Sequence, residues 1–165
     1  MAVLVLAQAA LGLVMARLPD SAIKFDLYQW HKSDGLVILG LALLRIAWRL
    51  ADPAPPLPAG MPRWERRAAR ANHLLLYLAL ILIPVTGLAL VSASPLEVPT
   101  LAFGLVYVPP LPLPRDEALE ATLIALHGAL AFAALALVGV HVAAALRHHF
   151  VLRDGLLGRM MRPRE

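Results

Sequence analysis

Apolar residues gather in four long stretches along the chain, and short polar or proline-rich segments separate these stretches. Residues 74–93 run for 20 positions without a charge, and residues 121–146 run for 26 positions whose only ionisable side chains are His127 and His141. A helix of about 20 apolar residues spans a bilayer. We therefore expect an all-α protein with one domain over residues 1–165, folded as an integral membrane up-down four-helix bundle. The expected helices cover about residues 1–17, 28–50, 72–93 and 119–147.

The other two stretches are less regular. The stretch at residues 28–50 ends with Arg45 and Arg49, which are four positions apart, share a helix face and can reach the headgroups. The first stretch covers only 16 residues, Met1 to Ala16. At about 1.5 Å per residue it is about one turn shorter than the hydrocarbon core. A signal peptide is the alternative, but no basic segment precedes the run and no small-x-small cleavage site follows it. We therefore favour a first membrane helix.

Two of the connecting segments have a distinct character. Residues 52–71 begin rich in proline and continue from Pro62 as a basic segment, which predicts an interfacial helix. The alternative, which we favour, is a plain anchor of positive charges at the membrane. Residues 94–117 contain six prolines, so a long helix is excluded there and we expect a loop over the outer end of the bundle.

Composition and charge support a membrane protein. The chain is 60% hydrophobic and 16% charged, whereas soluble domains are nearer half apolar and a quarter charged. It has no cysteine, which excludes disulfides, iron–sulfur clusters and thiolate zinc sites. Eleven basic residues lie on the side of the second loop and the C-terminus, and only four lie opposite. The positive-inside rule then places both termini in the cytoplasm, and no nucleic-acid partner is expected. The eleven are Arg45, Arg49, Arg63, Arg66, Arg67, Arg70, Arg147, Arg153, Arg159, Arg162 and Arg164; the four are Arg17, Lys24, Lys32 and Arg115.

The histidines are the candidate chemistry, because ionisable side chains within membrane spans are costly and usually functional. His127 and His141 are 14 positions apart on one helix, which puts them on the same face about 21 Å apart. Two imidazoles placed in this way would hold two haems stacked across the bilayer, since a neutral imidazole is a normal axial ligand of haem iron. In an up-down bundle His31 lies at the depth of His127, so these two form a consistent outer pair.

Other interpretations of the histidines remain open. An intramembrane histidine is often a hydrogen-bonded packing residue, and imidazole also binds copper or zinc. His127 and His141 are too far apart to share one ion. His148 and His149 are expected to face the headgroups. Gly35, Gly40, Gly128 and Gly139 are expected to leave room for a flat cofactor. The partner of His141 should come from the inner start of the first helix, where the sequence has no histidine.

Six segments resemble the bacterial cytochrome b561 family and cover nearly the whole chain in order. They are Tyr28-Gln-Trp-His-Lys-Ser-Asp-Gly, Leu43-Leu-Arg-Ile-Ala-Trp-Arg-Leu, Asn72-His-Leu-Leu-Leu-Tyr, Pro84-Val-Thr-Gly, Leu126-His-Gly-Ala-Leu-Ala and His141-Val-Ala-Ala-Ala-Leu-Arg-His-His-Phe. The resemblance implies a four-helix membrane protein with two b-type haems that moves electrons across the membrane, usually with quinone at the inner side. Some members take electrons from superoxide at the outer side.

Carried over to this chain, the resemblance makes His31 and His127 the ligands of the outer haem and His141 one ligand of the inner haem. The family's remaining ligand is a histidine, usually followed by tryptophan, at the inner start of helix one. The first residues here resemble the segment that normally follows such a pair, so we expect the natural start to lie upstream; the alternative is a natural loss of the ligand. His73 begins the third helix at the membrane boundary, and we do not expect it to lie at the depth of His141.

Further roles are expected for charged and aromatic residues near the two surfaces. Arg45 and Arg49 would neutralise propionates of the inner haem, and Lys24 and Lys32 would attract an anionic donor. A quinone head would bind at the inner boundary near a polar and aromatic group of residues. The members of this group are Arg147, His148, Arg63 and Trp64.

The function predicted from the sequence is transmembrane electron transfer through b-type haems. One alternative is a haem-bearing membrane-anchor subunit of a dehydrogenase or hydrogenase. Another is a structural or transport membrane protein without haem.

Overall fold

The computed structural model describes residues 1–53 and 60–153, and most of them are helical. Three of the helices contain about 30 residues each, and a short hairpin of two strands precedes the last of them. In chain order the elements are α1 (Ala2–Arg17), α2 (Ala22–Ala51), α3 (Arg63–Ala93), β1 (Thr100–Ala102), β2 (Val106–Val108), α4 (Glu117–Leu146) and a π-helical segment, η1 (Arg147–Leu152).

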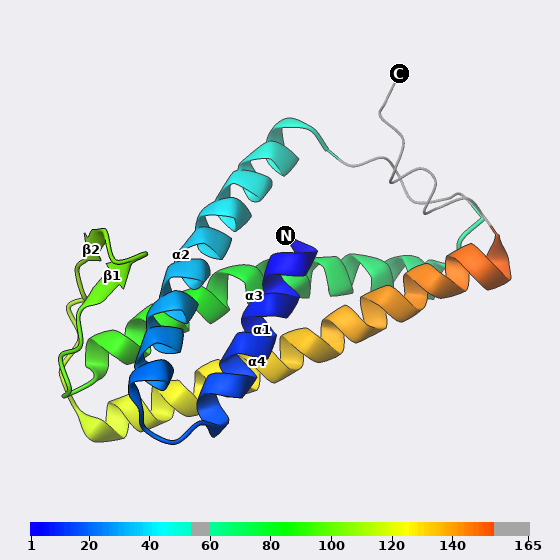
Figure 1. Ribbon diagram of the computed structural model, residues 1–165. Helices are drawn as coiled ribbons and strands as arrows, with labels where there is room; N and C mark the ends of the chain where they lie inside the picture. The colour runs from blue at the N-terminus through cyan, green and yellow to red at the C-terminus, as the bar shows by residue number, and fades with distance from the viewer. Residues whose placement is uncertain (54–59, 154–165) are drawn as a thin grey trace.

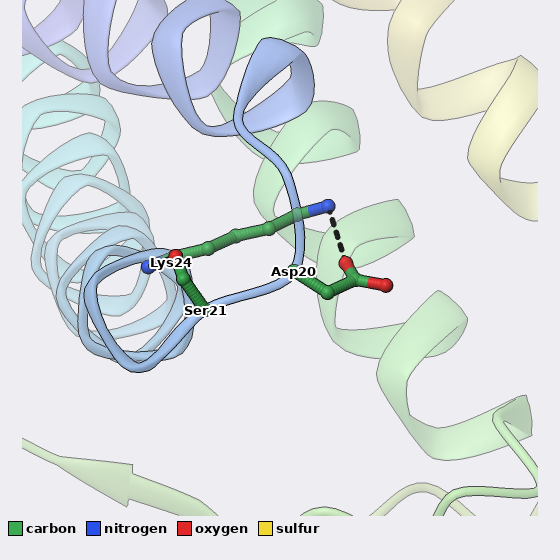
Figure 2. A network of polar contacts seen from close by, with 3 residues as sticks. All are labelled: Asp20, Ser21 and Lys24. Carbon is green, nitrogen blue, oxygen red and sulfur yellow. Dashed lines mark hydrogen bonds and ion pairs between the residues drawn. The ribbon is translucent and has the colours of Figure 1, made fainter.

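The corner between α1 and α2 is fixed by polar contacts at the start of α2 (Figure 2). The Ser21 side chain accepts a hydrogen bond from the Lys24 backbone N–H at 3.2 Å, which caps the helix. The Lys24 ammonium donates to the Asp20 carboxylate at 2.9 Å. This hydrogen bond lowers the pKa of Asp20 and raises the pKa of Lys24. The start of α2 is therefore defined by a side-chain N-cap and an adjacent ion pair.

The four helices border a large, partly open interior space. In Figure 1, α3 and α4 run antiparallel and side by side, while the C-terminal half of α2 rises away from them. Helix α2 packs on α3, and α1 packs on α2. Side chains from all four helices line a space of about 2290 Å³, more than twice the volume of about 1,000 Å³ at the upper end for ordinary ligand pockets. The fold therefore leaves room for a large group between the helices.

The outer surfaces of the helices are apolar. Exposed fractions reach 68% for Leu44, 60% for Leu74 and 63% for Phe132, and contiguous apolar surface of this kind marks contact with lipid or with other proteins. By length and composition, α3 and α4 with η1 can each cross a membrane. Helix α1 is apolar but shorter, and α2 carries several charges within its length.

The structure corrects several predicted boundaries. Helix α2 begins at Ala22, not near residue 28, because Ser21 caps it and its first turns are polar. The basic segment after Pro62 is helical and continuous with the apolar run that follows, since α3 runs without a break from Arg63 to Ala93. Apolarity locates the part of a helix that can lie in lipid, not the whole helix. Arg159, Arg162 and Arg164, which enter the predicted charge asymmetry, lie outside the described residues.

The fold is mostly helical, as expected, but residues 94–117 are not only loop, because they contain the short antiparallel pair β1 and β2. Thr100 pairs with Val108, Leu101 with Tyr107 and Ala102 with Val106. Polar residues of α2 hold the hairpin in place. The buried Ser33 hydroxyl of α2 accepts a hydrogen bond from the Phe103 backbone N–H of the hairpin at 2.8 Å. Prolines exclude helix from this segment, but the residues between them remain free to pair.

Candidate functional site

His31 of α2 and His127 of α4 face each other across the interior space. Their ring centres are 6.3 Å apart, the ring planes meet at 78°, and both side chains line the space. A metal–imidazole bond is about 2 Å long and a ring nitrogen lies about 1.1 Å from the ring centre, so two imidazoles on opposite sides of one iron have centres about 6 Å apart. The observed separation fits two axial ligands of one haem.

A glycine on the neighbouring helix lies behind each of these rings. A Cβ atom at Gly12 of α1 would be 3.1 Å from Cε1 of His31, and a Cβ atom at Gly87 of α3 would be 3.1 Å from Cε1 of His127. Contacts this short are rare for a real Cβ atom, so only glycine lets each ring keep its present place. The pairs α1–α2 and α3–α4 thus support the two rings in the same way.

Hydrogen bonds orient the His127 ring. Its Nδ1 atom lies 3.0 Å from the carbonyl oxygen of Ile83 and 3.2 Å from the Thr86 hydroxyl. A carbonyl only accepts, so Nδ1 donates a proton to it and Nε2 keeps a lone pair for a metal.

The support of the His31 ring is less complete. Its Nδ1 atom is buried and has no hydrogen-bond partner within residues 1–53 and 60–153. The Gln8 amide donates to the His31 carbonyl at 2.6 Å, which ties the backbone of this turn to α1.

His73 and His141 form a second histidine pair nearer the end where α3 begins and α4 finishes. Their ring centres are 5.3 Å apart at an interplanar angle of 59°. The expectation that the two lie at different depths is wrong, because the rings lie side by side; α3 starts ten residues before His73, so His73 is not at the start of its helix. The separation of 5.3 Å is 1.0 Å less than the 6.3 Å of the outer pair. The Asn72 amide lies 3.5 Å from Nδ1 of His141.

Most of the predicted residues of the inner end gather around the same space. Arg45, Arg49, Trp64, Arg147 and His148 line it, whereas Arg63 is exposed and does not. Sequence reasoning did not single out the residue that links this group, an acidic side chain inside the basic segment at the start of α3. The structure shows it to be Glu65, which binds both Arg147 and His148.

The remaining predicted residues are placed as follows. Lys24 is paired with Asp20, and the Lys32 ammonium donates to the Pro99 carbonyl at 3.1 Å, although both lysines still line the space. Three of the glycines expected to make room, Gly40, Gly128 and Gly139, have open space around them. In the part of the chain that the structure describes, no three His, Cys, Asp or Glu side chains converge on one point.

Comparison with known proteins agrees with this geometry. Residues 1–163 match the family model described as prokaryotic cytochrome b561. The chain is 38% identical over 133 residues to cytochrome b561 homolog 2 of Escherichia coli, an alignment that covers 79% of this chain and 68% of the relative. It is 35% identical over 135 residues to a probable superoxide oxidase of Yersinia pestis, with 79% and 72% covered. The chain therefore belongs to the prokaryotic cytochrome b561 family, whose members are membrane proteins that transfer electrons through b-type haem.

Proposed function

We propose that this protein carries electrons across a bacterial inner membrane and binds a b-type haem between His31 and His127. The observation that supports this most directly is the 6.3 Å between the two ring centres. When bound, the haem supplies one-electron redox chemistry at its iron. The chain would supply the two imidazoles, the glycines behind them and the largely apolar space between the helices.

We also propose an inner haem with His141 as one axial ligand. The rings of His141 and His73 are 5.3 Å apart, which is less than the roughly 6 Å expected for two imidazoles on one iron, and we leave the second ligand unassigned. Arg45 and Arg49 line the space at this end, where their guanidinium groups suit haem propionates. In this proposal all four helices cross the membrane and both termini are cytoplasmic.

The proposed electron acceptor is quinone at the inner end, near Arg147, His148, Arg63 and Trp64. The proposed donor at the outer end is superoxide, which the similarity to a probable superoxide oxidase supports. Lys24 and Lys32 would raise the local concentration of such an anion. A role as the membrane anchor of a dehydrogenase is the alternative, and a second chain that co-purifies from native membranes would favour it.

The haem assignment is tested by visible spectroscopy of the purified protein. We expect a reduced-minus-oxidised band of b-type haem, which the alternative without haem does not allow. His31→Ala and His127→Ala should each remove one haem per chain. His149→Ala is the matched control, because this side chain is exposed on η1 and contacts the Phe150 ring edge to face, and it should keep full haem content. Unchanged haem content in both ligand variants would show that the assignment is wrong.

A further inference from the structure

Glu65 lies at the inner end of the interior space and has no role in the function proposed above. It belongs to the first turn of α3, and its side chain is 14% exposed. Its Oε1 atom accepts a hydrogen bond from Nη1 of Arg147 at 2.5 Å and lies 3.3 Å from Nε2 of His148. His148 is buried, with 6% of its surface exposed. One carboxylate oxygen thus holds two consecutive side chains of η1.

The π-helical geometry of η1 makes this contact informative. Consecutive side chains of an α-helix point about 100° apart, yet Arg147 and His148 both reach the same oxygen atom. Single π-helical turns are rare and often occur at functional sites. Glu65 therefore contacts both side chains and links the start of η1 to α3.

The surroundings of Glu65 connect it to the interior space. Glu65, Arg147 and His148 all line that space, as do Trp64 and His141. Several other charged groups flank Glu65 or line the same end of the space. They are Arg45, Arg49, Asp52, Arg66 and Arg70. A carboxylate beside an imidazole at this place suits proton exchange, because imidazole can accept a proton at one ring nitrogen and release one from the other.

We propose that Glu65 is a positioning residue for quinone reduction, which holds His148 in place and passes protons to it from the aqueous phase. The inference rests on the proposed role of quinone at this end. Reduction of a quinone to a quinol takes up two electrons and two protons, and each carbonyl oxygen gains one O–H bond. The electrons come from the reduced protein, and both protons come from water by way of Glu65 and His148.

The test follows reoxidation of the purified, haem-loaded protein by decylubiquinone. The protein is reduced with a stoichiometric amount of dithionite, and the rate is measured by absorbance at several pH values. We expect Glu65→Gln to lower the limiting rate at neutral pH by at least about tenfold with an unchanged haem spectrum. The rate of this variant should rise towards acid pH, because protons then reach the quinone directly from solvent. Glu65→Asp, which keeps a carboxylate, should restore the wild-type pH profile in part.

The matched control is Glu97→Gln. Glu97 forms an ion pair with Arg115 in the segment before α4, away from the interior space, and its loss should leave the rate unchanged. Equal rates and pH profiles in wild type and Glu65→Gln would overturn this inference but not the quinone proposal. So would equal losses in Glu65→Gln and Glu65→Asp with the wild-type pH profile, since that pattern indicates packing alone. A wild-type protein that decylubiquinone does not reoxidise would overturn the quinone proposal itself and this inference with it.

Discussion

The His127 ring keeps its place only because position 87 has a hydrogen atom where other residues have a Cβ atom. The same holds for His31 and position 12. Glycine costs a helix about 1 kcal/mol relative to alanine, so two helices give up stability at the points where the imidazoles lie. Both glycines are visible in the sequence, but their role is not, because it depends on which helices become neighbours.

Gly87→Ala should therefore destabilise the protein, although alanine has a higher helix propensity than glycine. The new methyl group would contact Cε1 of His127 at 3.1 Å and displace the ring by a few tenths of an ångström, and we expect weaker haem binding and a lower melting temperature. Gly128→Ala is the control, because a Cβ atom there meets open space; it should gain up to about 1 kcal/mol in free energy of unfolding. The measurements are haem content and thermal unfolding. Equal gains in both variants would contradict the close contact.

The ion pair at the start of α2 predicts a local pH dependence. The hydrogen bond from Lys24 lowers the pKa of Asp20 below its ordinary value of 3.8. Because this pKa is depressed in the folded protein, the contribution to stability is present above pH 3.8 and is lost as the pH falls through the folded value. Lys24→Met should raise the pKa of Asp20 towards 3.8. An NMR titration of the Asp20 carboxyl carbon checks this, and an unchanged pKa would show that the pair is absent in solution.

Among the elements, the sequence predicts the two most apolar helices well. The uninterrupted runs at 74–93 and 121–146 lie within α3 and α4. The hairpin could also have been recognised, since Val106-Tyr-Val is a typical strand and Gly104, with a φ of 70°, marks the turn. It was not predicted because the prolines of residues 94–117 indicated a loop. The Glu65 contacts could not have been predicted, because they join residues 82 and 83 positions apart through a π-helical turn.

Ser33 should stabilise the hairpin on α2. Its hydroxyl accepts from the Phe103 N–H and donates to the Gln29 carbonyl, both at 2.8 Å, and Trp30 packs on Phe103 with ring centres 5.8 Å apart. Ser33→Ala removes the acceptor, which costs about 1 kcal/mol, and we expect faster proteolysis within residues 94–116.

Thr122→Ala is the control for this prediction. Within the described residues, the Thr122 hydroxyl donates to the Ala118 carbonyl of its own helix and does not touch the hairpin, so proteolysis of this variant should match the wild type. Equal cleavage of both variants would mean that the hairpin does not depend on Ser33. Protease digestion with mass spectrometry of the fragments gives the answer.

For the whole molecule, the proposed orientation can be mapped directly because the sequence has no cysteine. Leu105→Cys introduces one thiol at the hairpin tip, where Leu105 is 85% exposed, and Ala68→Cys introduces one in the basic start of α3. An impermeant maleimide added to intact cells should label the first variant, and it should label the second only after the membrane is opened. The reverse pattern would place the termini outside.

Helix α4 carries His127 and His141 on one unbroken stretch of helix, and the levels of these two side chains differ by about 21 Å. In the proposed orientation an electron that passes between these levels crosses about two thirds of a hydrocarbon core about 30 Å thick. A potential of 100 mV acts on a full crossing with about 2.3 kcal/mol. The same potential would therefore shift the distribution of the electron between the two levels by about 1.5 kcal/mol, or more than tenfold. Electron transfer along α4 would be electrogenic, and its direction would depend on whether the membrane is energised.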